Sequence, residues 1–387
     1  MIKLSRYTSP AQLANLGCEN LAIQTVDSCP QKLVAYLDFE EIFPIHSISD
    51  DSIWSKLQPM PADGVLSFSG WVGFFGYELL AFQFGIPTKA KRDLPVPAGW
   101  FGGPATLIHF NQEQTVIESK DPHREQEIEK RLLDSLSLDS PTLIHQKHSC
   151  NLSFKQYKDI FHQAREAILD GETYQIKISQ RFEAATQIDP LSAFTKLQKS
   201  NPAPEAFLLK TKEFSIVSCS PEVVIHKEAD RMITRPIGGT YRRDDSGTEH
   251  SLIERFLKDP KEVAEHNMLV DLERNDLSAL CLPGSVQIQN FREVESYAHL
   301  HHLVSTISGT LKENISLKEI YHETKKKMSS ELSYANKKSL IVFKSRLAWH
   351  CHFIQKLEDE PRIEFENMHP VYDNLRSEKF NEDYFLA

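Results

Sequence analysis

Hydrophobic and polar residues are spaced in two different ways along the chain. In the first 150 residues, short apolar runs such as Lys32–Leu37 and Ala105–Phe110 are separated by prolines and glycines. Runs of this length between turn residues are typical of strands joined by loops. We therefore predict a strand-rich first part of the chain. One helix is expected there, over Glu125–Leu136, where charged and helix-favouring residues replace the apolar runs.

A helical spacing begins after Ser153. Apolar side chains recur every three or four positions from Tyr157 to Ile168, Ser153 and Gln156 form a capping-box pattern, and Gly171 can end the helix. A strand is predicted next, over Thr173–Phe182, because apolar and polar residues alternate there. Its polar face is either solvated or lines a ligand site, and carries Gln175, Lys177 and Ser179.

The next hundred residues are predicted to hold further strands and helices. The expected strands are Phe207–Val217 and Val223–Ile233, with Ser218–Glu222 as the turn between them. The expected helices are Ser251–Leu257 and Lys261–Leu272.

A glycine pair and a glutamate pair are the candidate ligand-binding residues. Thr234–Thr240 is predicted to be a turn in which Gly238 and Gly239 let backbone N–H groups approach a small anion. Asp259 and Pro260 are suited to begin a helix, which would carry Glu262 and Glu265 on one face. Two carboxylates at that spacing suit Mg²⁺. The alternative is a surface turn beside a charged helix face.

Composition excludes several classes of protein. Asp and Glu number 54 against 44 Lys and Arg, and no basic patch is evident in the first 320 residues, which argues against nucleic-acid binding. The six cysteines are scattered without a C-x-x-C motif, as in reduced cytosolic proteins. No segment has the pattern of a signal peptide or a membrane span, and the apolar window Gly70–Gly85 contains Glu78. We expect a cytoplasmic protein without membrane partners, long enough for two or three domains or one large one.

Five ordered segments resemble the chorismate-utilising enzymes, such as component I of anthranilate synthase and of para-aminobenzoate (aminodeoxychorismate) synthase, and the isochorismate and salicylate synthases. The resemblance is dense over residues 150–322 and weaker before them, where Gly73–Glu78 is similar to an N-terminal segment of the family. The five segments are Gly171–Phe182, Ser220–Glu222, Arg235–Thr240, Lys261–Leu277 and Tyr297–Ser305.

The resemblance implies a fold and a set of roles. The fold is α+β, a two-part sandwich of largely antiparallel sheets covered by helices. By resemblance, Glu265 holds Mg²⁺ with Glu262, directly or through water, and Glu222 is the general acid. His302 is similar to the family's active-site histidine, whereas His299 and His301 are expected to be structural or exposed. Substrate contacts are assigned by resemblance to Lys177, Gly238, Gly239 and Thr240.

Position 175 distinguishes members within the family. Members that add water resemble one another in carrying a lysine base there, whereas members that add ammonia carry glutamine. Gln175 therefore indicates amination of chorismate, with ammonia supplied by a glutamine amidotransferase partner, because the chain shows no glutaminase segment of its own.

The product is less clearly indicated. Gly238 stands where many aminodeoxychorismate synthases carry a lysine, which favours anthranilate. The stretch Leu21–Ser28 does not resemble the Leu-Leu-Glu-Ser segment through which anthranilate synthases sense tryptophan, which favours the para-aminobenzoate enzyme of folate biosynthesis. We favour the latter, with 4-amino-4-deoxychorismate as product. The alternatives are anthranilate synthase component I and a non-catalytic remnant.

The resemblance stops near residue 324. We expect residues 1–150 to form an N-terminal region, 151–322 an incomplete chorismate-binding region, and 323–387 a divergent segment. Lys325–Ala387 lacks the family's Gly-Ala-Pro-Lys turn and last metal-binding glutamate, and contains no glycine. A frameshift, a deletion or a replaced C-terminus would explain this. With a ligand and the substrate clamps missing, we expect weak Mg²⁺ binding and little or no activity.

Overall fold

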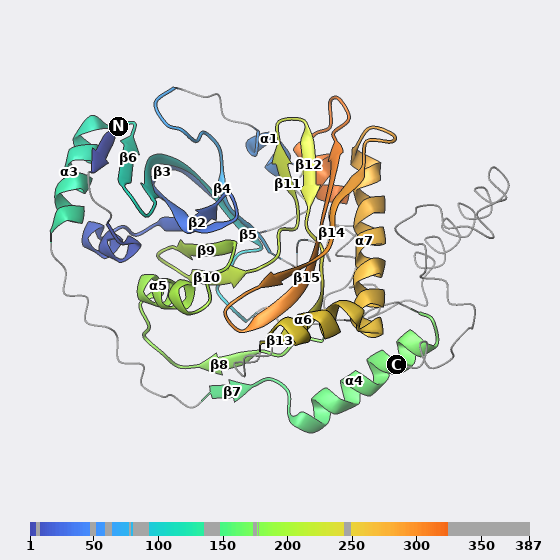
Figure 1. Ribbon diagram of the computed structural model, residues 1–387. Coiled ribbons are helices and arrows are strands. Elements are labelled where there is room, and N and C mark those ends of the chain that lie inside the picture. The colour runs from blue at the N-terminus through green and yellow to red at the C-terminus, as the bar shows by residue number, and fades with distance from the viewer. Residues whose placement is uncertain are drawn as a thin grey trace. The chain divides into compact units, whose positions relative to one another are not determined.

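The structure is a computed structural model. It describes residues 1–4, 8–46, 52–58, 64–76, 79, 93–134, 148–172, 176, 178–243 and 249–323. Met1–Lys147 and Ala184–Lys327 form one compact unit, and His148–Glu183 belongs to a second. Both units are shown in Figure 1.

The first unit contains an antiparallel sheet of eight strands, in the order β1-β6-β5-β3-β2-β9-β10, with β4 paired to β5 (Figure 1). Its strands are β1 Ile2–Leu4, β2 Leu21–Val26, β3 Cys29–Ile45, β4 Val72–Phe75, β5 Gly99–Phe110, β6 Thr115–Ser119, β9 Glu205–Lys210 and β10 Ser215–Ser220.

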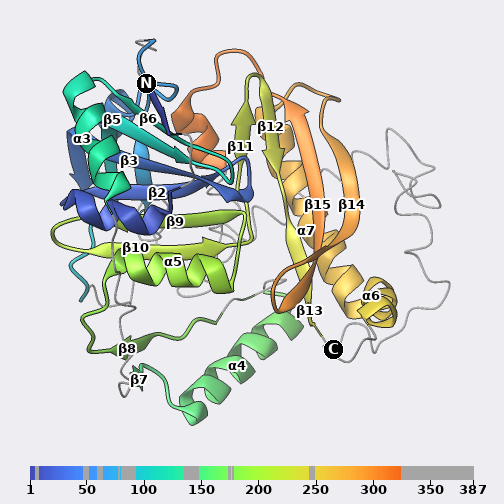
Figure 2. The ribbon, with the colours of Figure 1, turned by 60° about the vertical axis from the view of Figure 1, so that its left-hand side comes forward.

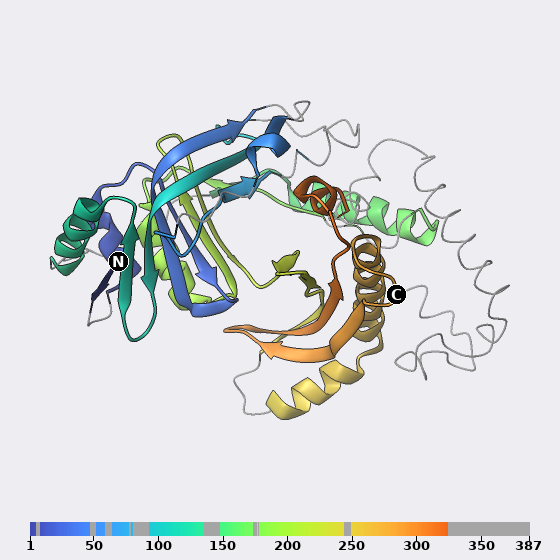
Figure 3. The ribbon, with the colours of Figure 1, turned by 90° about the horizontal axis from the view of Figure 1, so that it is seen from above.

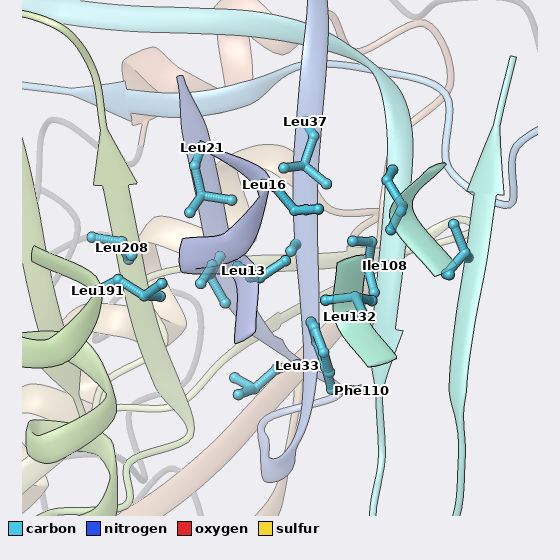
Figure 4. Close-up of a cluster of buried hydrophobic side chains, with 14 of the residues drawn as sticks. Leu13, Leu16, Leu21, Leu33, Leu37, Ile108, Phe110, Leu132, Leu191 and Leu208 are labelled. Atoms are coloured by element: carbon cyan, nitrogen blue, oxygen red, sulfur yellow. The ribbon is translucent and has the colours of Figure 1, made fainter. Parts of the chain in front are cut away.

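Both faces of this sheet are apolar, because buried residues alternate between two clusters along the strands. Leu33, Ala35 and Leu37 of β3 join one cluster, while Val34 and Tyr36 join the other. The first cluster is covered by η1 (Pro10–Leu16), α3 (Pro122–Leu133) and α5 (Pro190–Ser200), which contribute several of the side chains in Figure 4. Each fully buried leucine or isoleucine there stabilises the fold by about 1.5–3 kcal/mol relative to exposure.

A second antiparallel sheet of the same unit carries the candidate site. Its strands run in the order β11-β12-β15-β13, and β14 pairs with β15. They are β11 His226–Glu228, β12 Arg231–Thr234, β13 Ile237–Arg242, β14 Gln287–Ser296 and β15 Leu300–Thr310. Figure 2 shows helix α7 (Pro260–Leu280) running along this sheet, and Figure 3 shows α7 and α6 (Glu249–Lys258) from above.

Helix α7 begins where the sequence predicts. The Asp259 carboxylate accepts hydrogen bonds from the N–H groups of Lys261 and Glu262, and Pro260 occupies the first turn. The helix runs eight residues beyond the predicted end at Leu272. Its buried residues recur every three or four positions, so one stripe of the helix faces the sheet.

The second unit contains helix α4 (Phe154–Leu169) and the paired strands β7 (His148–Cys150) and β8 (Phe182–Ala184). The predicted capping box of Ser153 and Gln156 is present, and Gly171 has the positive φ of 69° expected of a helix stop. Helix α1 (Ser52–Lys56) and the helical residues 317–323 also belong to the first unit.

The predicted fold class is confirmed: the described strands pair antiparallel, and helices cover the sheets. The predicted divergent segment after residue 323 lies outside the described residues.

Three local predictions differ from the structure. The expected strand Phe207–Val217 is a hairpin of β9 and β10, because the Thr211 hydroxyl accepts from the N–H groups of Glu213 and Phe214 and closes a turn. The expected turn at Ser218–Glu222 accordingly starts later, since β10 continues to Ser220. Val223–Ile233 is likewise a hairpin of β11 and β12, with Ala229 at a φ of 51°.

Two further differences concern site segments. Of the predicted strand Thr173–Phe182, only Phe182 is in a strand among the described residues, and Thr173–Gln175 and Lys177 lie outside them. The predicted turn Thr234–Thr240 is instead the end of β12, a short connection and the beginning of β13. The register of β13 against β15 shifts between Ile237 and Thr240, so the glycines form a bulge in a strand.

Candidate functional site

The glycine pair lies where β13 packs closely against α7. A Cβ atom on Gly238 would lie 2.8 Å from Leu269 Cδ1 and 3.0 Å from the Cα of His266. Gly239 has a φ of 89°, and a Cβ atom there would lie 2.9 Å from Glu262 Oε2. Only glycine permits this approach of strand and helix together with the positive φ at the second position.

Glu262 joins the helix to the bulge. Its Oε2 accepts a hydrogen bond of 3.2 Å from the N–H of Thr240, and its Oε1 accepts one of 3.0 Å from the ammonium of Lys261. The side chain lies in the first turn of α7, where the positive end of the helix dipole favours a negative charge. The side chain is nearly buried, and each of its two oxygens accepts one of these hydrogen bonds.

His302 of β15 faces the same bulge. Its Nδ1 lies 3.0 Å from the Thr240 hydroxyl and 3.4 Å from the carbonyl oxygen of Gly239. Because a carbonyl oxygen only accepts, these contacts favour the proton on Nδ1, which leaves Nε2 as the basic nitrogen of the neutral ring. The ring of Tyr297 lies edge-on to His302, with centroids 5.4 Å apart.

Glu265 and Glu262 both lie near the ammonium group of Lys261. The Lys261 ammonium lies 3.6 Å from Glu265 Oε2 as well as 3.0 Å from Glu262 Oε1. The hydrogen bond to Glu262 raises the pKa of Lys261. Both carboxylates can therefore interact with one positive charge at the same time. Their oxygens suit a hard cation such as Mg²⁺. In the part of the chain that the structure describes, no group of three or more metal-ligating side chains occurs, so other oxygens would have to complete the coordination.

Comparison with known proteins identifies the family. The sequence profile of the family described as "chorismate binding enzyme" matches residues 30–324, most of the chain. The chain belongs to the chorismate binding enzymes. The match ends where the resemblance by sequence motifs ends.

Curated relatives of this chorismate binding enzyme include anthranilate synthases. The chloroplastic anthranilate synthase alpha subunit 1 of Oryza sativa subsp. indica is 32% identical, over 68% of this chain and 52% of the relative. An anthranilate synthase component I-like protein of Synechocystis is 34% identical, over 62% of this chain and 51% of the relative. The chain thus spans about half the length of these relatives.

Solved structures share the fold. Anthranilate synthase component I from Streptococcus pneumoniae superposes with a TM-score of 0.64 at 19% identity, covering 79% of this chain and 76% of that one. The isochorismate synthase MenF from Escherichia coli superposes with a TM-score of 0.57 at 11% identity, covering 85% and 74%. These likenesses show the chorismate-utilising enzyme fold.

Of the remaining candidate residues, the structure describes Glu222, His299 and His301. Glu222 lies on the connection between β10 and β11, where its N–H donates to Ser220 Oγ. His299 is exposed, and His301 is buried with its Nδ1 2.8 Å from Ser296 Oγ, which agrees with a structural or exposed role for both. Gln175 and Lys177 lie outside the described residues.

Two buried polar residues of this chorismate binding enzyme are not among the site residues predicted from the sequence. His266 Nδ1 lies 3.1 Å from the Gly238 carbonyl oxygen, and burial lowers the pKa of His266 to about 4. Glu273 accepts a hydrogen bond from the Thr234 hydroxyl. Both lie on the stripe of α7 that begins with Glu262, so a helical spacing of buried positions could have indicated them.

None of the helices in the described part of the chain is long and apolar enough to cross a membrane.

Proposed function

We propose that this chain binds chorismate at the β13 bulge and belongs to an enzyme that aminates chorismate in a Mg²⁺-dependent reaction. The observation that carries the proposal is the convergence of Glu262 and His302 on Thr240, through hydrogen bonds of 3.2 Å and 3.0 Å. A carboxylate, an imidazole and a hydroxyl within reach of one backbone bulge can neutralise charge and move protons at one ligand.

Glu262 and Glu265 are proposed to hold the cation. When bound, Mg²⁺ would neutralise the ring carboxylate of chorismate and draw charge from the reacting ring. Lys261 now lies against both glutamates and must give up that position to the cation. The Thr240 N–H stays on Glu262 Oε2 and orients the carboxylate.

Proton transfer is assigned to Glu222 and His302. The ring hydroxyl must leave as water, so an acid has to protonate it, and the resemblance gives that role to Glu222. His302 keeps its Nδ1 on Thr240 and Gly239, which would present Nε2 to the ligand. Gln175, which the structure does not describe, is proposed to admit ammonia rather than to deprotonate water. The ammonia is proposed to come from a glutamine amidotransferase subunit.

Anthranilate is the product that the comparisons favour, since the relatives named above are anthranilate synthases. The space around Gly238 supports this. A lysine there, as in many aminodeoxychorismate synthases, would push its Cβ against Leu269 and the backbone of His266. The second candidate is 4-amino-4-deoxychorismate, on the ground that Leu21–Ser28 does not resemble a tryptophan-sensing segment.

The test combines binding and turnover. The 387-residue chain would be titrated with chorismate and MgCl₂ in a calorimeter, and turnover would be followed with ammonium as donor. Anthranilate is detected by its fluorescence, and 4-amino-4-deoxychorismate by chromatography. We expect the chain to bind chorismate but to turn over little of it, because the proposed Mg²⁺ site has only two carboxylate ligands. A chimera carrying the corresponding C-terminal segment of the Streptococcus pneumoniae enzyme should turn over.

Two variants of the chimera assign the acid. Glu222→Gln should abolish amination without unfolding the protein, because only the proton donor is lost. Glu228→Gln, an exposed glutamate of β11, is the control. Failure of both chain and chimera to bind chorismate would contradict the proposal. Robust turnover by the 387-residue chain would show that Lys325–Ala387 supplies replacement groups.

A further inference from the structure

Three consecutive residues of the β13 bulge each bond to a different side chain. The Gly238 carbonyl oxygen lies 3.1 Å from His266 Nδ1, and the Gly239 carbonyl oxygen lies 3.4 Å from His302 Nδ1. The Thr240 N–H lies 3.2 Å from Glu262 Oε2. Two of these contacts reach the proposed site, and the third goes to a side chain behind it. Rotation of the peptide at Gly238 would disturb the other two, because the three groups belong to adjoining peptide units.

The group behind the bulge is itself held by a chain of hydrogen bonds. Because the Gly238 carbonyl only accepts, His266 donates from Nδ1, and its Nε2 is left to accept. Ser305 Oγ lies 2.6 Å from that Nε2 and therefore donates its proton there. The same Oγ accepts a hydrogen bond of 3.0 Å from the N–H of Arg292. Each polar atom in the chain thus has a partner of the correct kind.

Arg292 adopts an unusual conformation at this point. Its φ is 54°, and the register of β14 against β15 shifts between Asn290 and Glu293. A left-handed conformation is unfavourable for a residue with a side chain. The bulge in β14 directs the N–H of Arg292 to Ser305 instead of into the strand ladder. A second bulge is therefore bonded, through Ser305 and His266, to the glycine bulge of β13.

We propose that His266 and Ser305 are a positioning pair that fixes the Gly238 peptide and thereby aims Thr240 N–H at Glu262 and Gly239 C=O at His302. The inference rests on the proposed function for its purpose, since Glu262 and His302 are the residues that the bulge would serve. The fixing of the bulge by His266 and Ser305 does not itself depend on that function.

Two simpler roles explain less. A nucleophilic serine and histidine would need access to substrate, yet both side chains have 0% exposure. A space-filling role would be met by an apolar residue of similar size, which could not donate to Gly238. Without a donor, that buried carbonyl would lose its partner, and an unsatisfied buried acceptor destabilises the folded protein.

The first experiment measures the bulge itself. Ser305→Ala removes one oxygen, so the protein is expected to fold, and leaves His266 Nε2 without its donor. Ser308→Ala is the matched control: it lies on the same strand, is buried, and its hydroxyl accepts from Arg231 instead. Hydrogen–deuterium exchange of the full chain would be resolved to the Thr240 amide. We expect exchange there to rise about tenfold in Ser305→Ala and less than twofold in Ser308→Ala. Equal exchange in the two variants would overturn the proposal.

The second experiment asks which histidine nitrogen matters. His266→Asn places an amide N–H near the position of Nδ1, so it can still donate to Gly238, whereas His266→Gln moves the amide to the position of Nε2. Thr240 exchange should stay within about threefold of the parent in His266→Asn and rise about tenfold in His266→Gln. The reverse order would contradict the assignment. If either His266 variant fails to fold, the comparison of Ser305→Ala with Ser308→Ala tests the proposal.

Titration of the same proteins with MgCl₂ separates the proposal from the function. Ser305→Ala should weaken Mg²⁺ binding about threefold or more relative to Ser308→Ala, because Glu262 loses its orientation. If the parent chain binds no Mg²⁺ while Thr240 exchange still responds to Ser305→Ala, the metal assignment fails and the positioning pair stands. If the parent binds Mg²⁺ and Thr240 exchange does not respond, the positioning pair fails alone.

Discussion

A methyl group added at Gly239 should destabilise the protein through two separable effects. The residue has a φ of 89°, and its Cβ would lie 2.9 Å from Glu262 Oε2 and 3.3 Å from both Glu262 Cβ and Phe256 Cε2. The left-handed backbone costs an alanine about 1–2 kcal/mol. Forcing a methyl group into a filled space costs about 1–3 kcal/mol more. We therefore expect Gly239→Ala to lower the free energy of unfolding by about 2–5 kcal/mol.

Gly284→Ala measures the backbone effect alone. Its φ is 76°, and nothing lies within 4 Å of the position that its Cβ would take. Urea unfolding followed by circular dichroism should give a loss of about 1–2 kcal/mol for this control. The difference between the two variants is then the cost of the contacts with Glu262 of α7 and Phe256 of α6.

A double-mutant cycle attributes that contact to a side chain. In a Glu262→Ala background the oxygen facing Gly239 is gone, so Gly239→Ala should cost about 0.5–3 kcal/mol less than in the parent protein. The reasoning is refuted if Gly239→Ala costs no more than Gly284→Ala, or if the Glu262→Ala background leaves its cost unchanged. The first result would mean that the added methyl group meets no neighbour at this bulge, and the second that Glu262 is not the neighbour it meets.

Three further outcomes are expected. Lys261→Met should raise Mg²⁺ affinity about two- to fivefold by calorimetry, because it removes the ammonium near the two glutamates. Lys258→Met should leave the affinity unchanged. Weaker Mg²⁺ binding in Lys261→Met would contradict competition between Lys261 and the metal. Gln175→Lys in the active chimera should divert part of the turnover to water addition, since an amine can deprotonate water, and unchanged product ratios by chromatography would remove that assignment. Cys150 is exposed while burial raises the pKa of the Cys281 thiol, so iodoacetamide at pH 8 should label Cys150 before Cys281 by peptide mass spectrometry; prior labelling of Cys281 would contradict its burial.

Local elements were largely predictable from the sequence, because their signals act over a few residues. The start of α7 depends on Asp259 and Pro260, and the start of α4 on the capping box of Ser153 and Gln156. The family resemblance, dense over residues 150–322, lies in contiguous motifs, and the family match confirms it. The hairpin of β9 and β10 was missed because its turn is closed by the Thr211 hydroxyl within an otherwise strand-like run.

The candidate site was predictable as a set of residues and not as an arrangement. Two glycines and two glutamates are recognisable in ordered motifs without any structure. The sequence did not distinguish a turn from a bulge, because glycine is compatible with both conformations. Packing distinguishes the two, since pairing of β13 with β15 and the close approach of α7 leave no room for side chains at Gly238 and Gly239. His266 and Ser305 are 39 residues apart, and only the packing of a helix on a strand places their side chains within hydrogen-bonding distance.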